Sequence, residues 1–241
     1  METTKTIALV SGANRGIGYA IAEGLARRGM TVLLGCRDLA KGEAAARALR
    51  DKGLDLRPVQ LDTTDEASVA SLAATIGKDD GRLDVLINNA GIGLDFVETL
   101  SVTERLVRTL DVNVAGTVRL TEAMRPLLQR SARGRIVNIS SELASFALRS
   151  DPNWQFATFE LPTYAASKAA VNALTVSYAR SLARFGIKVN AVCPGYTATE
   201  STNFASTRMP DEAAVIAVAM ATLGEDGPTG SFANDAGELP W

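Results

Sequence analysis

Short apolar runs alternate with longer amphipathic stretches along most of this chain. The apolar runs that have the character of buried strands are 7–10, 32–35, 57–61, 85–87, 135–140 and 188–192. The stretches in which apolar residues recur at helical spacing are 19–28, 40–51, 65–76, 103–130, 164–184 and 210–223. Regular alternation of strands and helices is typical of a parallel sheet with helices on both faces. The pattern therefore predicts an α/β fold with a doubly wound parallel sheet.

The end of the chain and its length complete this picture. Residues 227–233 predict a turn that is followed by a short final strand. No internal repeat, low-complexity tract or linker interrupts the alternation, and 241 residues suit one large α/β core. We therefore expect a single domain over 1–241.

The turn between the first strand and the first helix is rich in glycine, with the sequence SGANRGIG at 11–18. A strand, a glycine turn and a helix aim backbone N–H groups at an anion such as a pyrophosphate. The spacing is G-x-x-x-G-x-G rather than the common fingerprint G-x-G-x-x-G, and a glycine turn without a ligand is the alternative. The loop residues that we expect at a dinucleotide are Gly12, Asn14, Arg15, Gly16, Ile17 and Gly18.

The residues after the second strand distinguish the two common dinucleotides. An acidic residue usually binds the adenosine ribose hydroxyls of NAD there, but this chain has Cys36 followed by Arg37. Arg37 and Arg15 together suit the 2′-phosphate of NADP(H), because guanidinium groups form charge-assisted, bidentate hydrogen bonds with phosphate. Asp38 is interpreted as the N-cap of the next helix. The alternative is that both arginines are solvated surface charges.

Charge and composition exclude several classes of function. The formal net charge of −2 gives no reason to expect nucleic acid or an anionic membrane as a partner. No apolar run is long enough to span a bilayer. Residues 5–13 resemble a weak signal sequence, but cleavage there would separate the glycine loop from its strand. Cys36 and Cys193 form no CxxC pair, so we expect a reduced, cytoplasmic protein.

The chain contains no histidine, which narrows the possible chemistry. A Ser-His-Asp triad and histidine metal ligands are excluded, and we expect no metal site. Tyr164 and Lys168 lie four residues apart and share a helix face. A nearby ammonium favours the phenolate and lowers the tyrosine pKa, which allows proton transfer near neutral pH. The pattern Y-x-x-x-K also occurs by chance on helix surfaces.

Polar residues follow several of the predicted strands. Asp62 follows the third strand, and it either accepts a hydrogen bond from an adenine amino group or caps the next helix. Asn89, Ala90 and Gly91 follow the fourth strand, where small residues let a flat ring lie against the backbone. Asparagines that satisfy a turn are the alternative. Asn113 lies among apolar residues of a predicted helix and needs partners, either protein groups or a bound water.

The last parallel strand is followed by the sequence CPGYTAT at 193–199. Pro194 and Gly195 enforce a turn. Thr197 and Thr199 then present hydroxyl and backbone groups where a carboxamide could bind.

Taken in order, SGANRGIG, NNAG, Asn113, NISS, YAASK and PGYTAT resemble the motifs of the short-chain dehydrogenase/reductase family over nearly the whole chain. Arg15 with Arg37, the segment GPTGSF and Trp241 further resemble the carbonyl reductase branch of that family. The resemblance implies a Rossmann-like fold and a site for NADP(H). It also implies a hydride transfer between this cofactor and a carbonyl or alcohol.

The resemblance implies a role for each matching residue. Tyr164 would be the acid in reduction and the base in oxidation, while Lys168 would lower its pKa and bind the nicotinamide ribose. Ser141 would hold the substrate oxygen, and Ser140 would be structural. Asn113 would fix a water that relays protons to Lys168. The cofactor cleft would be lined by Asn89, Ala90, Gly91, Pro194, Gly195, Thr197 and Thr199.

Two departures from the family pattern concern the substrate side. The gap between Ser141 and Tyr164 is longer than usual, because 146–161 forms an insertion near the substrate mouth. Such an insertion can obstruct a helix-to-helix dimer, and the sequence leaves monomer and homo-oligomer open. The segment after Thr199 is short, so we expect an open pocket. Its candidate lining residues are Ile92, Leu94, Leu143, Trp154, Phe156, Tyr196 and Phe204, which suit a hydrophobic carbonyl compound.

The leading hypothesis is an NADPH-dependent reductase of ketones or aldehydes that also works in reverse as an alcohol dehydrogenase. The alternative is a regulatory protein that senses NADP(H) without turnover. Such a protein would be expected to lose one or more of Asn113, Ser141, Tyr164 and Lys168, which are all present. An enoyl reductase is a third reading, but the spacing of tyrosine and lysine usually differs in that branch.

Overall fold

The computed structural model describes residues 5–241, so residues 1–4 of the expected domain lie outside it. Its centre is an eight-stranded sheet in the order β3-β2-β1-β4-β5-β6-β7-β8. The strands are β1 Ile7–Ser11, β2 Thr31–Cys36, β3 Leu56–Gln60, β4 Val85–Asn88, β5 Arg135–Ile139, β6 Lys188–Val192, β7 Phe232–Asn234 and β8 Gly237–Glu238. All neighbouring strands run parallel except β7 and β8. The expected doubly wound sheet is confirmed, and β8 adds an antiparallel edge that the sequence pattern does not predict.

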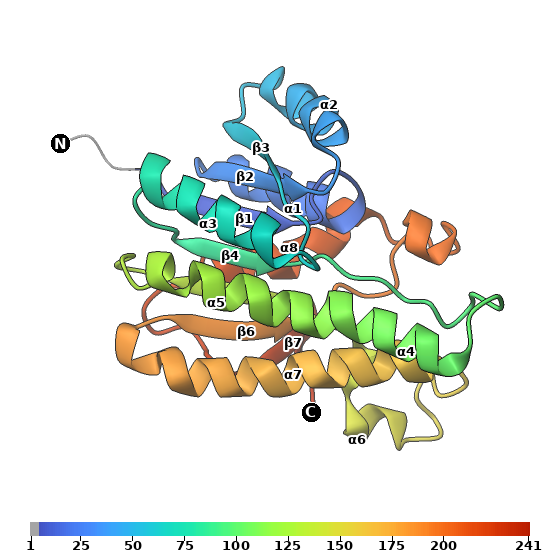
Figure 1. Ribbon diagram of the computed structural model, residues 1–241. Coiled ribbons are helices and arrows are strands. Elements are labelled where there is room, and N and C mark those ends of the chain that lie inside the picture. The colour runs from blue at the N-terminus through green and yellow to red at the C-terminus, as the bar shows by residue number, and fades with distance from the viewer. Residues whose placement is uncertain (1–4) are drawn as a thin grey trace.

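Helices cover both faces of the sheet (Figure 1). They are α1 Gly16–Ala26, α2 Leu39–Arg50, α3 Glu66–Asp79, α4 Val102–Leu110, α5 Gly116–Leu128, α6 Phe146–Arg149, α7 Pro162–Leu182 and α8 Pro210–Ala221. Side chains alternate across a strand, so β1 contributes to two cores. Ala8 and Val10 pack with α1, α2 and α8, whereas Leu9 packs with α3, α5 and α7. Within residues 5–241, every helix is too short or too polar to cross a membrane.

The strand order reverses between β1 and β4, because β2 and β3 lie on one side of β1 and the later strands on the other. In an open α/β sheet, ligands bind outside the carboxyl ends of the strands at such a reversal. The glycine loop follows β1 and the sequence NNAG begins at the end of β4. The topology therefore brings these two motifs to the same crevice.

The stretch 103–130 is not the single regular helix that its spacing predicts. Between α4 and α5 lies a π-helical turn, Asp111–Ala115, with Asn113 at its centre. A π turn holds one more residue than an α turn, and such bulges are frequent at functional sites. The backbone carbonyl of Asn113 accepts a hydrogen bond from Thr117 Oγ1 at 2.8 Å. Apolar spacing cannot reveal this turn, because the apolar residues on both sides continue to face the core.

The insertion at 146–161 forms the short helix α6 and a series of turns. The end of the chain contacts it, since the N–H of Ala147 donates to the carbonyl of Trp241 at 3.2 Å. The Trp241 ring stacks on Phe232 of β7 with the centroids 5.6 Å apart. Trp241 thus connects the insertion to β7 of the sheet.

Candidate active site

The glycine loop has the geometry that only glycine adopts readily. Gly12 and Gly16 have φ of +64° and +56°. A Cβ built on Gly18 would lie 2.4 Å from both the carbonyl oxygen of Gly12 and Nδ2 of Asn89. Helix α1 begins at Gly16, three residues before the expected start at Tyr19. The loop therefore ends directly in a helix N-terminus, where N–H groups and the helix dipole favour an anion.

The sequence NNAG is bonded directly to the glycine loop. The Ser11 hydroxyl accepts hydrogen bonds from the N–H groups of Asn89 at 2.9 Å and Ala90 at 3.0 Å. In return, Asn89 Nδ2 donates to the carbonyls of Ser11 at 2.8 Å and Gly12 at 3.1 Å. The asparagine thus satisfies backbone groups, as the alternative interpretation held, and this same contact places Ala90 beside the loop, while Gly91 lies near Asn113 and Lys168.

The residues after β2 are arranged as expected for the helix cap. Asp38 accepts hydrogen bonds from the N–H groups of Ala40 at 3.0 Å and Lys41 at 3.2 Å, which confirms it as the N-cap of α2. Cys36 is buried, and Arg37 is exposed. With its carboxylate engaged at the cap, Asp38 leaves the neighbouring guanidinium accessible to an anion.

Asp62 does not cap the following helix, which rules out one of its two interpretations. Asp65 is the N-cap of α3 and accepts from the N–H of Ala67 at 2.9 Å. Asp62 Oδ1 instead accepts from the backbone N–H and the hydroxyl of Thr64, at 2.9 and 2.7 Å. Burial opposes ionisation of Asp62, but these bonds and the charge of Arg37 hold its pKa below the ordinary value.

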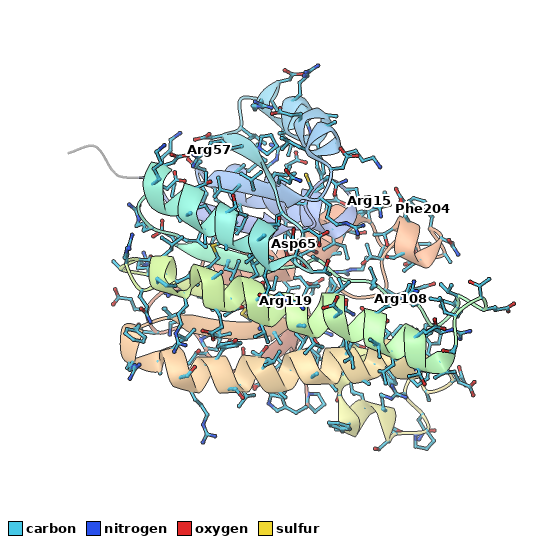
Figure 2. The ribbon with its side chains drawn as sticks, in the orientation of Figure 1. Arg15, Arg57, Asp65, Arg108, Arg119 and Phe204 are labelled. Carbon is cyan, nitrogen blue, oxygen red and sulfur yellow. The ribbon has the colours of Figure 1, made fainter. Side chains whose placement is uncertain are left out.

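Arg15 has a partner that the sequence does not predict. Its guanidinium forms an ion pair with Glu200, which begins the 3₁₀ turn Glu200–Thr202 after β6. A Cβ on Gly16 would lie 3.5 Å from Cγ2 of Thr199, so this segment lies against the glycine loop. Figure 2 shows Arg15 and Phe204 on the same side of the molecule, at the start of α1 and after the 3₁₀ turn. We name 199–204 the covering segment.

Tyr164 and Lys168 occupy one face of α7, as their spacing predicts. Lys168 Nζ lies 5.5 Å from the centroid of the Tyr164 ring and donates to the carbonyl of Ile139 at 2.7 Å. The lysine side chain is buried, and desolvation lowers its pKa to about 8. Its ammonium can therefore give up a proton near neutral pH.

The pKa of Tyr164 departs from its expected direction. Desolvation raises it above the ordinary value of a phenol, the buried Cys193 adds to this, and the nearby Ser141 side chain lowers it only in part. The expected direction of the Tyr164 pKa is therefore wrong for the protein alone, because burial of the phenol decides the direction. Tyr164 is held as a neutral phenol, the form that can donate a proton.

The two consecutive serines after β5 have different environments. The Ser141 hydroxyl accepts from the N–H of Leu143 at 3.2 Å, and it lies near enough to the Tyr164 hydroxyl to lower the pKa of that phenol. The Ser140 hydroxyl is buried and donates to Asn172 Oδ1 at 2.6 Å. The structural role expected for Ser140 fits this contact, and Ser141 is the serine that the fold brings to Tyr164.

Asn113 uses its whole side chain within the protein. Its Oδ1 accepts from the N–H of Ile92, and its Nδ2 donates to the carbonyl of Ile92, both at 2.8 Å. Nδ2 also donates to Ser167 Oγ at 2.9 Å. The structural interpretation of the amide is thus correct. The water-binding role stays a prediction.

The turn after β6 contains Gly195 with φ of +78° and the buried Thr197, whose hydroxyl donates to the carbonyl of Gly195 at 2.9 Å. Thr199 Oγ1 pairs with Ser201 Oγ at 2.8 Å. The Cys193 thiol beside Tyr164 has a pKa raised to about 12, because it is buried and lies near Glu142. It stays protonated, so it does not act as a base at neutral pH.

Aromatic residues of the insertion contact the turn after β6. Trp154 and Phe156 pack edge to face with centroids 5.4 Å apart, and Tyr196 lies 6.5 Å from Phe156 and 6.1 Å from Phe159. Among the other candidate pocket residues, Leu143 is buried, Ile92 and Leu94 are half-buried, and Phe204 is 64% exposed. Three of the candidates, Trp154, Phe156 and Tyr196, thus lie together with Phe159, whereas Phe204 is largely exposed in the covering segment.

Asp95 has a role that the sequence pattern did not reveal. Its carboxylate accepts from the N–H groups of Thr163 at 2.9 Å and Tyr164 at 3.0 Å, across 68 and 69 residues of sequence. The local signal for such a contact is weak but present: α7 follows Leu161, which offers no side-chain cap. A helix without an N-cap residue of its own needs an acceptor from elsewhere.

Comparison with known proteins agrees with this arrangement. The family model described as short chain dehydrogenase matches residues 6–210. The short-chain dehydrogenase/reductase ATR10 of Stachybotrys chlorohalonatus is 35% identical, with 100% of this chain and 95% of the relative covered. Carbonyl reductase [NADPH] 1 of Rattus norvegicus is 31% identical, with both chains fully covered. The NADPH-bound carbonyl reductase from chicken fatty liver has a TM-score of 0.85 at 28% identity, covering 98% of this chain and 99% of its own.

These similarities extend over the sheet, the glycine loop and α7 alike. The family model alone matches well over half of the chain, and the relatives are matched along nearly their whole length. The expected resemblance is confirmed, and the chain belongs to the short-chain dehydrogenase/reductase family.

Proposed function

We propose that this protein is an NADP(H)-dependent oxidoreductase that reduces ketones or aldehydes and works in reverse as an alcohol dehydrogenase. The observation that carries the proposal is the buried Lys168 with its Nζ 5.5 Å from the centroid of the Tyr164 ring, while Ser141 lies near the Tyr164 hydroxyl. Relatives named carbonyl reductase [NADPH] that match over the full chain support the same assignment.

The residues at the strand reversal fit NADP(H). The glycine loop leaves no room for side chains at Gly12 and Gly18 and ends in a helix N-terminus, which suits a pyrophosphate. Arg37 and Arg15 supply positive charge for a 2′-phosphate, and Asp62 Oδ2 is available to an adenine amino group. The residues that would hold the nicotinamide end are Asn89, Ala90, Gly91, Lys168, Pro194, Gly195, Thr197 and Thr199. When bound, the cofactor supplies a hydride to the carbonyl carbon.

The protein's own contribution to the reaction is to manage charge on the substrate oxygen. Ser141 and Tyr164 donate hydrogen bonds to that oxygen and stabilise the negative charge that develops as the hydride arrives. Tyr164 then gives its proton to the oxygen, which completes the alcohol. The Lys168 ammonium stabilises the resulting phenolate, and its pKa of about 8 lets it take part in reprotonation through a water held at Asn113.

The substrate proposed is a small hydrophobic carbonyl compound. The aromatic cluster of Trp154, Phe156, Phe159 and Tyr196 comes from the insertion and from the turn that follows β6. Aromatic rings bind flat apolar groups by offset or edge contacts. Aryl ketones and aldehydes therefore fit this mouth better than charged substrates do. No observation favours the NADP(H)-sensing alternative.

The decisive experiment measures NADPH oxidation with a panel of aryl and aliphatic ketones. Tyr164→Phe should lower turnover about 10²- to 10⁴-fold, the usual contribution of a positioned acid, with NADPH affinity little changed. Tyr178→Phe is a matched control, because Tyr178 is a second tyrosine on α7 that contacts Glu122 instead. Unchanged turnover in Tyr164→Phe would refute the proposal. NADPH binding by the wild type without turnover of any carbonyl would favour the sensing alternative.

A further inference from the structure

The first turn of α7 obtains its hydrogen-bond acceptors from a distant loop. Pro162 has no N–H, and the N–H of Ala165 donates to the carbonyl of Leu161 at 2.9 Å. The remaining two donors, on Thr163 and Tyr164, both donate to the Asp95 carboxylate. The backbone of Tyr164 is thus bonded to a side chain from the loop between β4 and α4. A carboxylate at this end of the helix also faces the positive pole of its dipole.

The loop that carries Asp95 is itself fixed at several points. Arg105 of α4 donates to the carbonyls of Asp95 at 2.8 Å and Leu100 at 2.9 Å. Three residues before Asp95, the backbone of Ile92 is held at both its N–H and its carbonyl by Asn113. The Asp95 carboxylate is therefore held in place by its own loop. It is the position of this carboxylate that fixes the first turn of α7.

The same loop contacts the Tyr164 side chain. A Cβ on Gly93 would lie 3.3 Å from Cδ2 of the Tyr164 ring, so the loop backbone covers one side of the ring. On the other end of the residue, the Tyr164 carbonyl accepts from Ser167 Oγ at 2.7 Å, and Ser167 Oγ accepts from Asn113. The amide, the ring and the carbonyl of Tyr164 are each connected to the region between β4 and the π turn.

We propose that Asp95 is a positioning residue for the reaction: its carboxylate fixes the first turn of α7 so that the Tyr164 hydroxyl meets Ser141. This inference rests on the proposed function, in which Tyr164 gives the proton. Asp95 touches neither the substrate oxygen nor the proton in this scheme and acts only through the backbone of Tyr164. Displacement of a reacting group by about 1 Å can lower the rate about 10²-fold. Loss of the two hydrogen bonds from Asp95 to the first turn of α7 should therefore slow the reaction.

The test compares Asp95→Asn and Asp95→Ala with Asp65→Ala. Asp65 is the control, because it also accepts a backbone N–H at the start of a helix, α3 (Figure 2), and α3 carries none of the proposed catalytic residues. Single-turnover rates of NADPH oxidation with an aryl ketone are measured beside the NADPH dissociation constant and the thermal midpoint. We expect Asp95→Ala to lose about 10- to 100-fold in rate with NADPH affinity within about twofold of wild type. The single-turnover rate of Asp95→Asn should lie between those of the wild type and Asp95→Ala, because the amide side chain keeps one acceptor oxygen.

The control separates positioning from general loss of stability. Asp65→Ala should lower the thermal midpoint by a similar amount and keep its single-turnover rate. The inference is overturned if Asp95→Ala keeps its rate within about twofold, or if Asp65→Ala loses as much rate for the same thermal shift. If Asp95→Ala does not fold, Asp95→Asn decides by the same criteria. Full activity in Tyr164→Phe would instead overturn the proposed function, whereas an inactive Tyr164→Phe beside a fully active Asp95→Ala overturns this inference alone.

Discussion

Lys168 carries a charge into a site with little compensation for it. Its Nζ donates to the carbonyl of Ile139, and the described residues provide no carboxylate within 4.0 Å of it. Desolvation therefore lowers its pKa to about 8, below the ordinary lysine value of about 10.4. Keeping this group charged at pH 7 costs folding free energy of about 3 kcal/mol. A lysine with a purely structural role would stabilise the fold, whereas the charged Lys168 lowers its stability. This difference indicates a chemical role for Lys168.

Linkage gives this cost a sign that can be measured. Between pH 8 and 10.5 the unfolded chain binds the Lys168 proton while the folded protein has lost it, so the unfolding free energy rises with pH. We expect the wild type to gain up to about 3 kcal/mol relative to Lys168→Met as pH rises from 7 to 10.5. Urea unfolding of both proteins over this range measures the difference. Parallel curves would show that the lysine is not desolvated as described.

At the scale of elements, the ion pair between Arg15 and Glu200 connects α1 to the covering segment. Both side chains are largely exposed, so the pair itself contributes little, about 0.2–1 kcal/mol. Glu200 nevertheless competes with any phosphate for the Arg15 guanidinium. We expect Glu200→Gln to tighten NADPH binding about two- to fivefold, with a smaller change for NADH and a weaker effect at high salt. Titration of both cofactors measures it.

Replacement of Arg37 should change NADPH affinity in the opposite direction. Arg37→Asp should weaken NADPH binding far more than NADH binding, because only NADPH carries the 2′-phosphate that a guanidinium at this strand end would contact. Equal losses for both cofactors would contradict the assignment of Arg37. If Glu200→Gln binds both cofactors as tightly as the wild type does, Arg15 interacts only with the covering segment and not with a cofactor phosphate.

The elements themselves were largely predictable from the sequence, and the reason is their local character. The six expected strands are β1 to β6, each within one residue of its expected bounds at either end, because apolar runs of a buried parallel sheet are local signals. The π turn at Asn113 and the 69-residue contact from Asp95 to the Tyr164 amide were not predicted. Both depend on backbone partners that are distant in sequence. The raised pKa of Tyr164 was missed for the same reason, since burial is set by the assembled fold.

At the scale of the whole molecule, the end of the chain ties the insertion to the sheet. The Trp241 ring stacks on the fully buried Phe232, and its backbone carbonyl accepts a hydrogen bond from the N–H of Ala147 in α6. Trp241→Ala should lower the free energy of unfolding by about 1–2 kcal/mol, because it removes an aromatic contact and apolar burial. Phe146→Ala is the control, since Phe146 is 74% exposed and its loss should change stability little. Equal denaturant midpoints for Trp241→Ala and the wild type would contradict this tie.

The two outermost strands of the sheet are poor templates for another strand. Pro58 lies in β3, at one edge, and lacks the N–H that a neighbouring chain would need as a donor. At the opposite edge, β8 is only two residues long and antiparallel to β7. Short or proline-containing margins resist edge-to-edge joining. Copies of this protein that meet at high concentration should therefore resist joining through the edges of their sheets.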